Sequence, residues 1–249
     1  MSEFDYSSFP PGYYQEVMEN GPKIQRAWHL QKFSRIATIL SAAPARKLLD
    51  IGCFAGSFLG LLSPEQANEQ VGVDIIESQI KFAQARFGNQ FRSFKFIKSI
   101  NDLSNAGDLF DVVTLIEVIE HLSVEELKVI FEEIDKILIS DGRLVITTPN
   151  YLSFWPLLEI LIKMSSGVNY QEQHLTHFYF PNIFEKLKTI APQVFEKYTL
   201  ELKTSSHFLA PFLAFISLKF SNRLSQFINP KRWRNPFGPL IIIVLRKKL

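Results

Sequence analysis

The stretch of sequence that decides the fold runs from Leu48 to Leu59 and reads LLDIGCFAGSFL. A short apolar run leads into two glycines, Gly52 and Gly56, and then into a second apolar segment. Glycine lets the backbone turn sharply and approach a ligand without a Cβ in the way. The N–H groups at a helix start also favour an anion or a carboxylate. The stretch predicts a strand, a ligand-binding loop and a helix, with an ordinary tight turn as the alternative.

Short apolar runs alternate with amphipathic stretches along the rest of the chain. The expected strands are Lys47–Ile51, Val71–Asp74, Phe94–Ile97, Asp111–Leu115 and Leu144–Thr147, and the expected helices between them are Glu77–Phe87 and Val124–Ile139. Alternating strands and helices are typical of a parallel sheet that is buried on both faces. We therefore expect an α/β fold with a Rossmann-like, doubly wound sheet, whose binding core covers residues 46–150.

Two flanking regions extend this core within one expected domain of 249 residues. Residues 1–45 are predicted to form an N-terminal arm or lid, irregular to residue 22 and then helical over Ile24–Leu40. Residues 151–249 are expected on the substrate side. There we expect a helix over Pro181–Ile190, a strand over Val194–Leu202, an apolar-basic insertion and a last strand over Leu240–Leu245.

Composition narrows the class of protein. A hydrophobic content of 47% suits a sizeable core, and the lone Cys53 excludes an internal disulfide. No apolar run reaches the length of a membrane-spanning helix, and the N-terminus does not resemble a signal peptide. We therefore expect a cytoplasmic protein, either free or at a membrane surface.

The charge is unevenly distributed, because every charged residue from Leu202 to Leu249 is basic. Residues 208–234 combine these charges with apolar side chains, which fits peripheral contact with an anionic membrane or a cap over an apolar acceptor. Helices packed on the sheet edge with a solvated basic rim are the alternative. Nucleic acid is a less favoured partner because the basic residues are sparse and no RNA-binding motif is present.

Two acidic residues follow the first two strands, and with the glycine loop they carry a family resemblance. Asp74 ends the second strand, about where an acidic residue meets ribose hydroxyls in this architecture. The pattern Asp50-x-Gly52-x-x-x-Gly56 plus Asp74 resembles the first two motifs of class I S-adenosylmethionine-dependent methyltransferases. The resemblance implies that the loop, with Cys53 and Phe54, holds the methionine part of S-adenosylmethionine and that Asp74 takes the ribose.

Further cofactor contacts are expected beside these motifs, from Ile75 next to Asp74 and from Ile100 and Asn101 after the third strand, near the adenine. The loop departs from the family pattern at Phe54, where relatives usually carry a glycine. An NAD-dependent dehydrogenase would instead carry the G-x-G-x-x-G fingerprint.

A second cluster follows the fourth strand, where Glu117, Glu120 and His121 lie at the sheet edge that binds ligands in open α/β folds. A helical turn there would bring the three side chains into one pocket. Histidine suits proton transfer near neutral pH. A surface helix start with a capping or packed imidazole is the alternative.

This cluster extends the resemblance to a group of relatives. Residues 117–122, 147–150 and 174–178 resemble ubiquinone-biosynthesis-type O-methyltransferases and their broad relatives. The resemblance implies methylation of a small-molecule, lipid, quinone-precursor or glycan hydroxyl. His121 is the first candidate for the base and His174 or His177 the second, while Glu117 is expected at both the catalytic and the cofactor site.

Two alternatives remain open for the function. Small-RNA 2′-O-methyltransferases show a similar arrangement that holds magnesium, which suggests a divalent metal on Glu117, Glu120, His121 and His177 as a less favoured hypothesis. A non-catalytic scaffold is the other alternative, supported by Phe54 and by the absence of an Asp on the adenine side.

Overall fold

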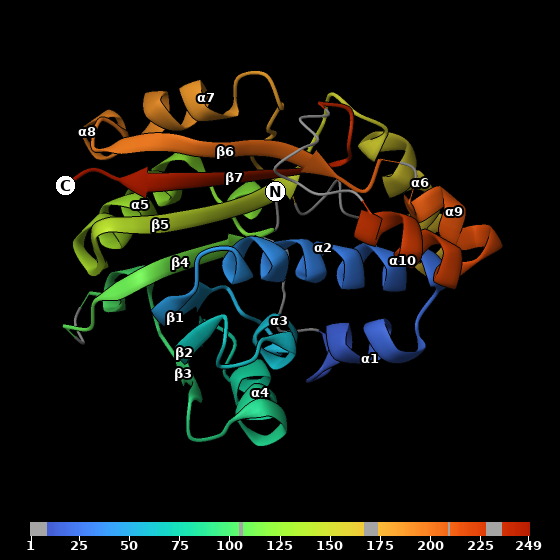
Figure 1. Cartoon of the computed structure of the whole chain (residues 1–249), viewed down its shortest axis with the longest axis horizontal. Coiled ribbons are helices and arrows are strands. Elements are labelled where there is room, and N and C mark those ends of the chain that lie inside the picture. The colour runs from blue at the N-terminus through green and yellow to red at the C-terminus, as the bar shows by residue number, and fades with distance from the viewer. Residues whose placement is uncertain (1–8, 105–106, 167–173, 209, 228–235) are drawn as a thin grey trace.

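The computed structural model describes residues 9–104, 107–166, 174–208, 210–227 and 236–249 (Figure 1). Its centre is a seven-stranded sheet in the order β3-β2-β1-β4-β5-β7-β6. The strands are β1 Ala45–Ile51, β2 Ala67–Asp74, β3 Arg92–Phe96, β4 Phe110–Ile116, β5 Leu138–Pro149, β6 Tyr198–Ser206 and β7 Leu240–Lys247. Strands β1 to β5 pair in parallel, and β7 runs antiparallel to both β5 and β6. The expected α/β, Rossmann-like class is confirmed.

Helices cover both faces of this sheet, as Figure 1 shows. They are α1 Tyr13–Asn20, α2 Lys23–Ser41, α3 Ser57–Leu61, α4 Glu77–Phe87, α5 Val124–Ile137, α6 Trp155–Ser166, α7 Ile183–Ile190, α8 Pro192–Phe195, α9 Ala210–Ile216 and α10 Leu218–Phe227. Two short 3-10 turns, η2 Ile100–Asp102 and η3 Ile119–His121, follow β3 and β4.

Alternate strand residues point to opposite faces and build two separate cores. Leu49 and Val113 belong to the core beneath α5, α7 and α8. Their neighbours Leu48 and Val112 belong to the core beneath α2, α3, α4 and α6. Near-continuous apolar strands are required because both faces of the parallel sheet are covered.

Three local expectations were wrong. The N-terminal arm is not irregular to residue 22, because the helix α1 forms directly after Gly12, which is its N-cap. Val194 and Phe195 belong to α8 rather than to a strand, since Pro192 begins a helical turn that buries both side chains, and β6 begins at Tyr198. The helix α5 ends at Ile137, because the backbone is extended from Leu138 into β5.

The C-terminal insertion lies where it was expected, since α9 and α10 stand between β6 and β7. Among the described residues, no helix is both long and apolar enough to cross a bilayer.

Candidate active site

A cavity of about 560 Å³ lies at the carboxyl ends of β1, β2 and β4. Three segments that are distant in sequence contribute to its wall: the loop after β1, the helix α2 and the segment that follows β4. The cavity therefore joins the two clusters that were expected separately, the glycine loop and the acid–histidine group.

The loop after β1 depends on left-handed backbone. Gly52 and Gly56 both have φ of +72°, and an added Cβ would lie 2.6 Å from the Val118 side chain at the first and from Phe94 at the second. Phe54 also has a positive φ, +47°, which costs about 1 to 2 kcal/mol for a residue with a Cβ. The family glycine is thus replaced by a phenylalanine that keeps the left-handed backbone.

Two buried carboxyl groups flank this loop. Asp50 accepts a 2.6 Å hydrogen bond from the Thr114 hydroxyl. Burial raises the pKa of Asp50 to about 7, although the Thr114 hydrogen bond opposes the shift. Asp74 accepts backbone N–H bonds from Phe54 at 2.8 Å and from Ile76 at 2.9 Å, and burial raises its pKa as well. Asp74 therefore holds the loop while it faces the cavity.

The remaining expected cofactor residues lie at different places. Cys53 lines the cavity, and burial keeps the pKa of its thiol well above its usual range. Ile75 and Ile100 also line the cavity. Asn101 is exposed on η2 and lies outside the cavity wall, so the structure does not bring it to the other cofactor residues.

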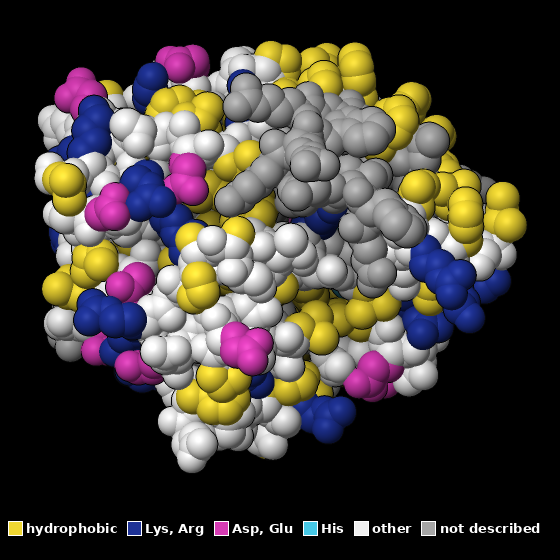
Figure 2. Space-filling view, in the orientation of Figure 1, with side chains coloured by type: hydrophobic (Ala, Val, Ile, Leu, Met, Phe, Trp, Pro, Cys, Tyr) yellow, Lys and Arg dark blue, Asp and Glu magenta, His cyan; other side chains and the backbone are white. Residues whose placement is uncertain are grey.

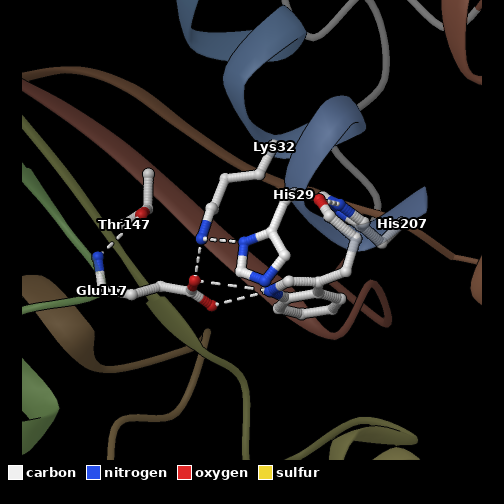
Figure 3. Close-up of polar contacts among 6 residues, drawn as sticks. His29, Lys32, Glu117, Thr147 and His207 are labelled. Atoms are coloured by element: carbon white, nitrogen blue, oxygen red, sulfur yellow. Dashed lines mark hydrogen bonds and ion pairs between the residues drawn. The ribbon is translucent and has the colours of Figure 1, made fainter. Parts of the chain in front are cut away.

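Glu117 is held by α2, which the sequence reasoning did not foresee (Figure 3). The Trp28 indole N–H donates to a Glu117 oxygen at 3.0 Å, and the Lys32 ammonium pairs with the same carboxylate. The Glu117 backbone N–H donates to the Thr147 carbonyl at 3.0 Å, with a φ of +53°. The one available signal was the four-residue spacing of Trp28 and Lys32, which puts them on one helix face.

Two histidines lie beside this group. His29 Nδ1 lies 3.4 Å from the Lys32 ammonium, and His207 Nε2 donates a hydrogen bond to the Trp28 carbonyl at 2.9 Å. Burial lowers the pKa of His29 well below its usual range and that of His207 to about 3. Both rings are therefore neutral near pH 7.

Glu120, His121 and His174 form a compact group farther along the cavity wall. One ligand atom from each lies within 4.8 Å of the others, and the two imidazole rings are 4.9 Å apart. Glu120 is fully buried, and neither of its side-chain oxygens has a hydrogen-bond partner within the described segments. Burial and the neighbouring Glu117 raise the pKa of Glu120. A buried carboxyl group beside two imidazoles is chemically suited to a divalent metal.

Tyr151 and Glu159 orient His174, and the sequence reasoning missed both. The Tyr151 hydroxyl lies 2.5 Å from His174 Nδ1, and Glu159 Oε1 lies 3.5 Å from the same nitrogen. The backbone N–H groups of Leu175 and Thr176 donate to the Glu120 carbonyl at 2.8 and 3.0 Å. These bonds tie the segment after residue 173 to η3.

The expected metal set of Glu117, Glu120, His121 and His177 is not assembled as a whole. His177 is exposed, stacks on the Tyr151 ring at 4.1 Å and lies outside the cavity wall. Glu117 is engaged by α2. His174 instead lies with Glu120 and His121, and the backbone bonds of Leu175 and Thr176 hold its segment beside η3.

The N-terminal arm reaches the cavity through Tyr14. Its ring lies 4.9 Å from Phe54 and 5.1 Å from His29. The buried Gln79 accepts a hydrogen bond from the Gly12 N–H at 2.9 Å and so ties the arm to α4. These contacts are compatible with a lid, as expected for this segment, and equally with a packed wall.

Comparison with known proteins supports the reading of this geometry. Residues 49–146 match a family model described as a methyltransferase domain. A small RNA 2′-O-methyltransferase of Schizosaccharomyces pombe is 30% identical over 178 residues, which cover 63% of this chain and 45% of that protein. The chain therefore spans about half the length of the curated relative that it matches.

Similar solved structures share the fold. They include the methyltransferase domain of bacterial CtHen1-C (TM-score 0.61, 16% identity, 89% of this chain and 99% of that one). A SAM-dependent methyltransferase from Archaeoglobus fulgidus is also similar (TM-score 0.59, 23% identity, 98% and 100%). A third is the N-methyltransferase NodS from Bradyrhizobium japonicum WM9 (TM-score 0.54, 17% identity, 91% and 97%). Residues 49–146 are thus similar to a methyltransferase domain, and the fold is that of the S-adenosylmethionine-dependent methyltransferases.

Proposed function

We propose that the protein methylates a hydroxyl group of a small-molecule acceptor, such as a lipid, a quinone precursor or a glycan. The observation that carries this proposal is that one cavity is lined both by the glycine loop with Asp50 and Asp74 and by the pair His121 and His174. A donor bound at the loop would thus lie in the same space as an imidazole able to take a proton. Positioning of this kind lowers a barrier by roughly 7 to 11 kcal/mol.

The cofactor residues have distinct roles in this proposal. The loop from Gly52 to Gly56 holds the methionine part, Asp74 the ribose, and Ile75 with Ile100 the adenine. Bound S-adenosylmethionine would supply an electrophilic sulfonium methyl group, so that a carbon–oxygen bond would form as the sulfur–carbon bond breaks and its electron pair stays on sulfur. Glu117, held by Trp28 and Lys32, lies in the wall of the same cavity.

The proton of the acceptor hydroxyl goes to an imidazole nitrogen of His121, our first choice of base. His174 adjoins His121, and its Nδ1 is fixed by Tyr151. His174 is therefore a second base or a support for His121. We assign no proton transfer to His177, whose exposed side chain lies outside the cavity wall.

Calorimetric titration with S-adenosylhomocysteine tests the cofactor site. We expect micromolar binding by the wild type and at least about tenfold weaker binding by Asp74→Ala, because the variant loses the ribose acceptor and the carboxylate that shapes the loop. Glu132→Ala, an exposed change on α5, is the matched control. Absence of binding by the wild type would favour a non-catalytic scaffold.

A second candidate function is metal-assisted 2′-O-methylation of RNA. The unpartnered, buried Glu120 carboxyl beside His121 and His174 supports it, as does the similarity to a small RNA 2′-O-methyltransferase. A divalent ion held by these three residues would supply positive charge that acidifies a nearby hydroxyl. Glu159 and Tyr151 would then orient His174.

Manganese titration followed by thermal unfolding tests this candidate. We expect stabilisation of the wild type by the metal, lost in His174→Ala and kept in His177→Ala. RNA binding should weaken steeply with salt, because phosphate contacts release counterions. Unchanged activity on an identified acceptor after chelation would exclude the metal-assisted reaction.

A further inference from the structure

The helix α6 exposes an apolar face on the side opposite to its buried one. Trp155 and Leu158 are buried, and Trp155 lines the cavity. Phe154, Leu157 and Ile160 follow one another at three-residue spacing and are 49%, 48% and 52% exposed. A helix that is apolar on both sides is normally covered on both. Among the described residues, no segment buries this outer face, and its side chains stay about half exposed.

The helices α9 and α10 extend this face with further exposed apolar side chains. The Phe154 ring lies 6.4 Å from the ring of Phe212 on α9. Ile216 is 82% exposed and Phe220 57% exposed at the junction of α9 and α10. Figure 2 shows apolar side chains gathered over this corner, with Lys and Arg side chains beside them.

The exposed charges that the structure describes on α10 are all positive. Lys219 and Arg223 are exposed on α10, and the sequence holds no Asp or Glu from Leu202 to Leu249. On α6, Glu159 is buried against His174. Exposed apolar side chains flanked by Lys and Arg suit a surface that offers hydrocarbon beneath negative headgroups.

We propose that the apolar-basic face, formed by Phe154, Leu157, Ile160, Ile216 and Phe220 with Lys219 and Arg223, docks on an anionic lipid bilayer. The apolar side chains enter the headgroup boundary, while the two cations meet lipid phosphates. Since no described helix can span a membrane, the contact is peripheral.

Docking would set the cavity beside the bilayer, because α6 places Trp155 in the cavity wall and Leu157 on the outer face. A hydroxyl acceptor anchored in the membrane by an apolar tail could then reach the site without leaving the lipid. This consequence rests on the proposed function, whereas the docking itself does not.

Flotation of the full chain with vesicles tests the docking. We expect binding to vesicles of phosphatidylcholine mixed with phosphatidylglycerol, little binding to phosphatidylcholine alone, and release as salt screens the charges. Lys219→Glu with Arg223→Glu should weaken binding by roughly tenfold or more, and Ile216→Ser with Phe220→Ser should do the same. The controls are Lys128→Glu and Leu109→Ser, exposed changes elsewhere.

Several results would overturn the docking proposal: no binding to anionic vesicles at low salt, equal binding to neutral vesicles, or variants that bind like the wild type. Light scattering that shows a dimer broken by Leu157→Ser would assign the face to a second copy of the chain instead. Titration with S-adenosylhomocysteine separates the two proposals: vesicle binding without cofactor binding would uphold docking and overturn the methyl transfer.

Discussion

At the scale of single residues, the burial of Asp50 couples folding to pH. Its pKa rises from 3.8 to about 7 because the carboxyl group is buried. The folded state therefore holds the proton more tightly than the unfolded state, and the contribution of Asp50 to stability is complete below pH 3.8. This contribution is lost as pH rises toward about 7, by up to roughly 4 kcal/mol.

Asp50→Asn should flatten this pH dependence, since the amide carries no charge and can still accept from Thr114. We expect the variant to be more stable than the wild type at pH 8 and nearly equal to it at pH 4. Urea unfolding of both proteins at several pH values measures the difference. Parallel curves between pH 4 and pH 8 would show that Asp50 is not the responsible group.

Replacing His121 should affect turnover and cofactor affinity to different extents. We expect His121→Ala to lower turnover by about 10²- to 10⁴-fold, the usual contribution of a general base. Its affinity for S-adenosylhomocysteine should stay within a few-fold of the wild type, because the glycine loop is untouched. His177→Ala is the matched control and should leave turnover nearly unchanged. A parallel loss of turnover and affinity in His121→Ala would argue against the base.

At the scale of elements, α2 and the segment after β4 are joined by a largely buried ion pair. The side chains of Lys32 and Glu117 are 5% and 16% exposed. Removing one partner of such a pair leaves the other charge uncompensated, at a cost of about 3 to 5 kcal/mol. Lys32→Met should therefore destabilise the fold by about that amount.

A double-mutant cycle identifies this coupling. Lys32→Met combined with Glu117→Gln should recover much of the stability lost in the single variant, because no charge is then left unpaired. Denaturant unfolding of the four proteins gives the interaction free energy. Additive effects of the two changes would mean that the pair does not hold α2 to the site.

Elements differ in how well local patterns predict them. The core strands were recognisable from their near-continuous apolar runs, which lie between glycines and amphipathic stretches. Few secondary structures other than a buried strand fit such a short run. The helix α4 was predicted over its full length, Glu77–Phe87. The helix α1 was missed because the prolines around it indicate irregular backbone, whereas it forms by packing Val17 and Met18 against the rest of the molecule.

At the scale of the whole molecule, the cavity wall draws on residues from Tyr14 to Leu175. A ligand bound in this cavity should stabilise the folded state, because the unfolded chain has no such cavity. At a ligand concentration of 100 times Kd, we expect about 2.7 kcal/mol of added stability. Thermal unfolding with S-adenosylhomocysteine measures it, and the at least tenfold weaker binding expected of Asp74→Ala should cut the added stability to about half or less. A shift retained in full by that variant would place the ligand elsewhere.

The sequence by itself determined the sheet class, the glycine loop and the two clusters of residues from which the cavity wall is built. Apolar periodicity, the two glycines and the strand-end carboxylates act within a few residues, so their consequences are local. The left-handed φ of Phe54 was not predicted, although relatives usually carry a glycine at that position.

Only the tertiary structure decided which side chains meet in the site. Lys32 and Glu117 are 85 residues apart, and Tyr151 reaches a histidine 23 residues later. No local spacing links such partners, because their approach depends on how α2 crosses the sheet edge and on how residues 174–176 bond to Glu120. The same packing selected His174 over His177, two residues that the sequence presents as near equivalents.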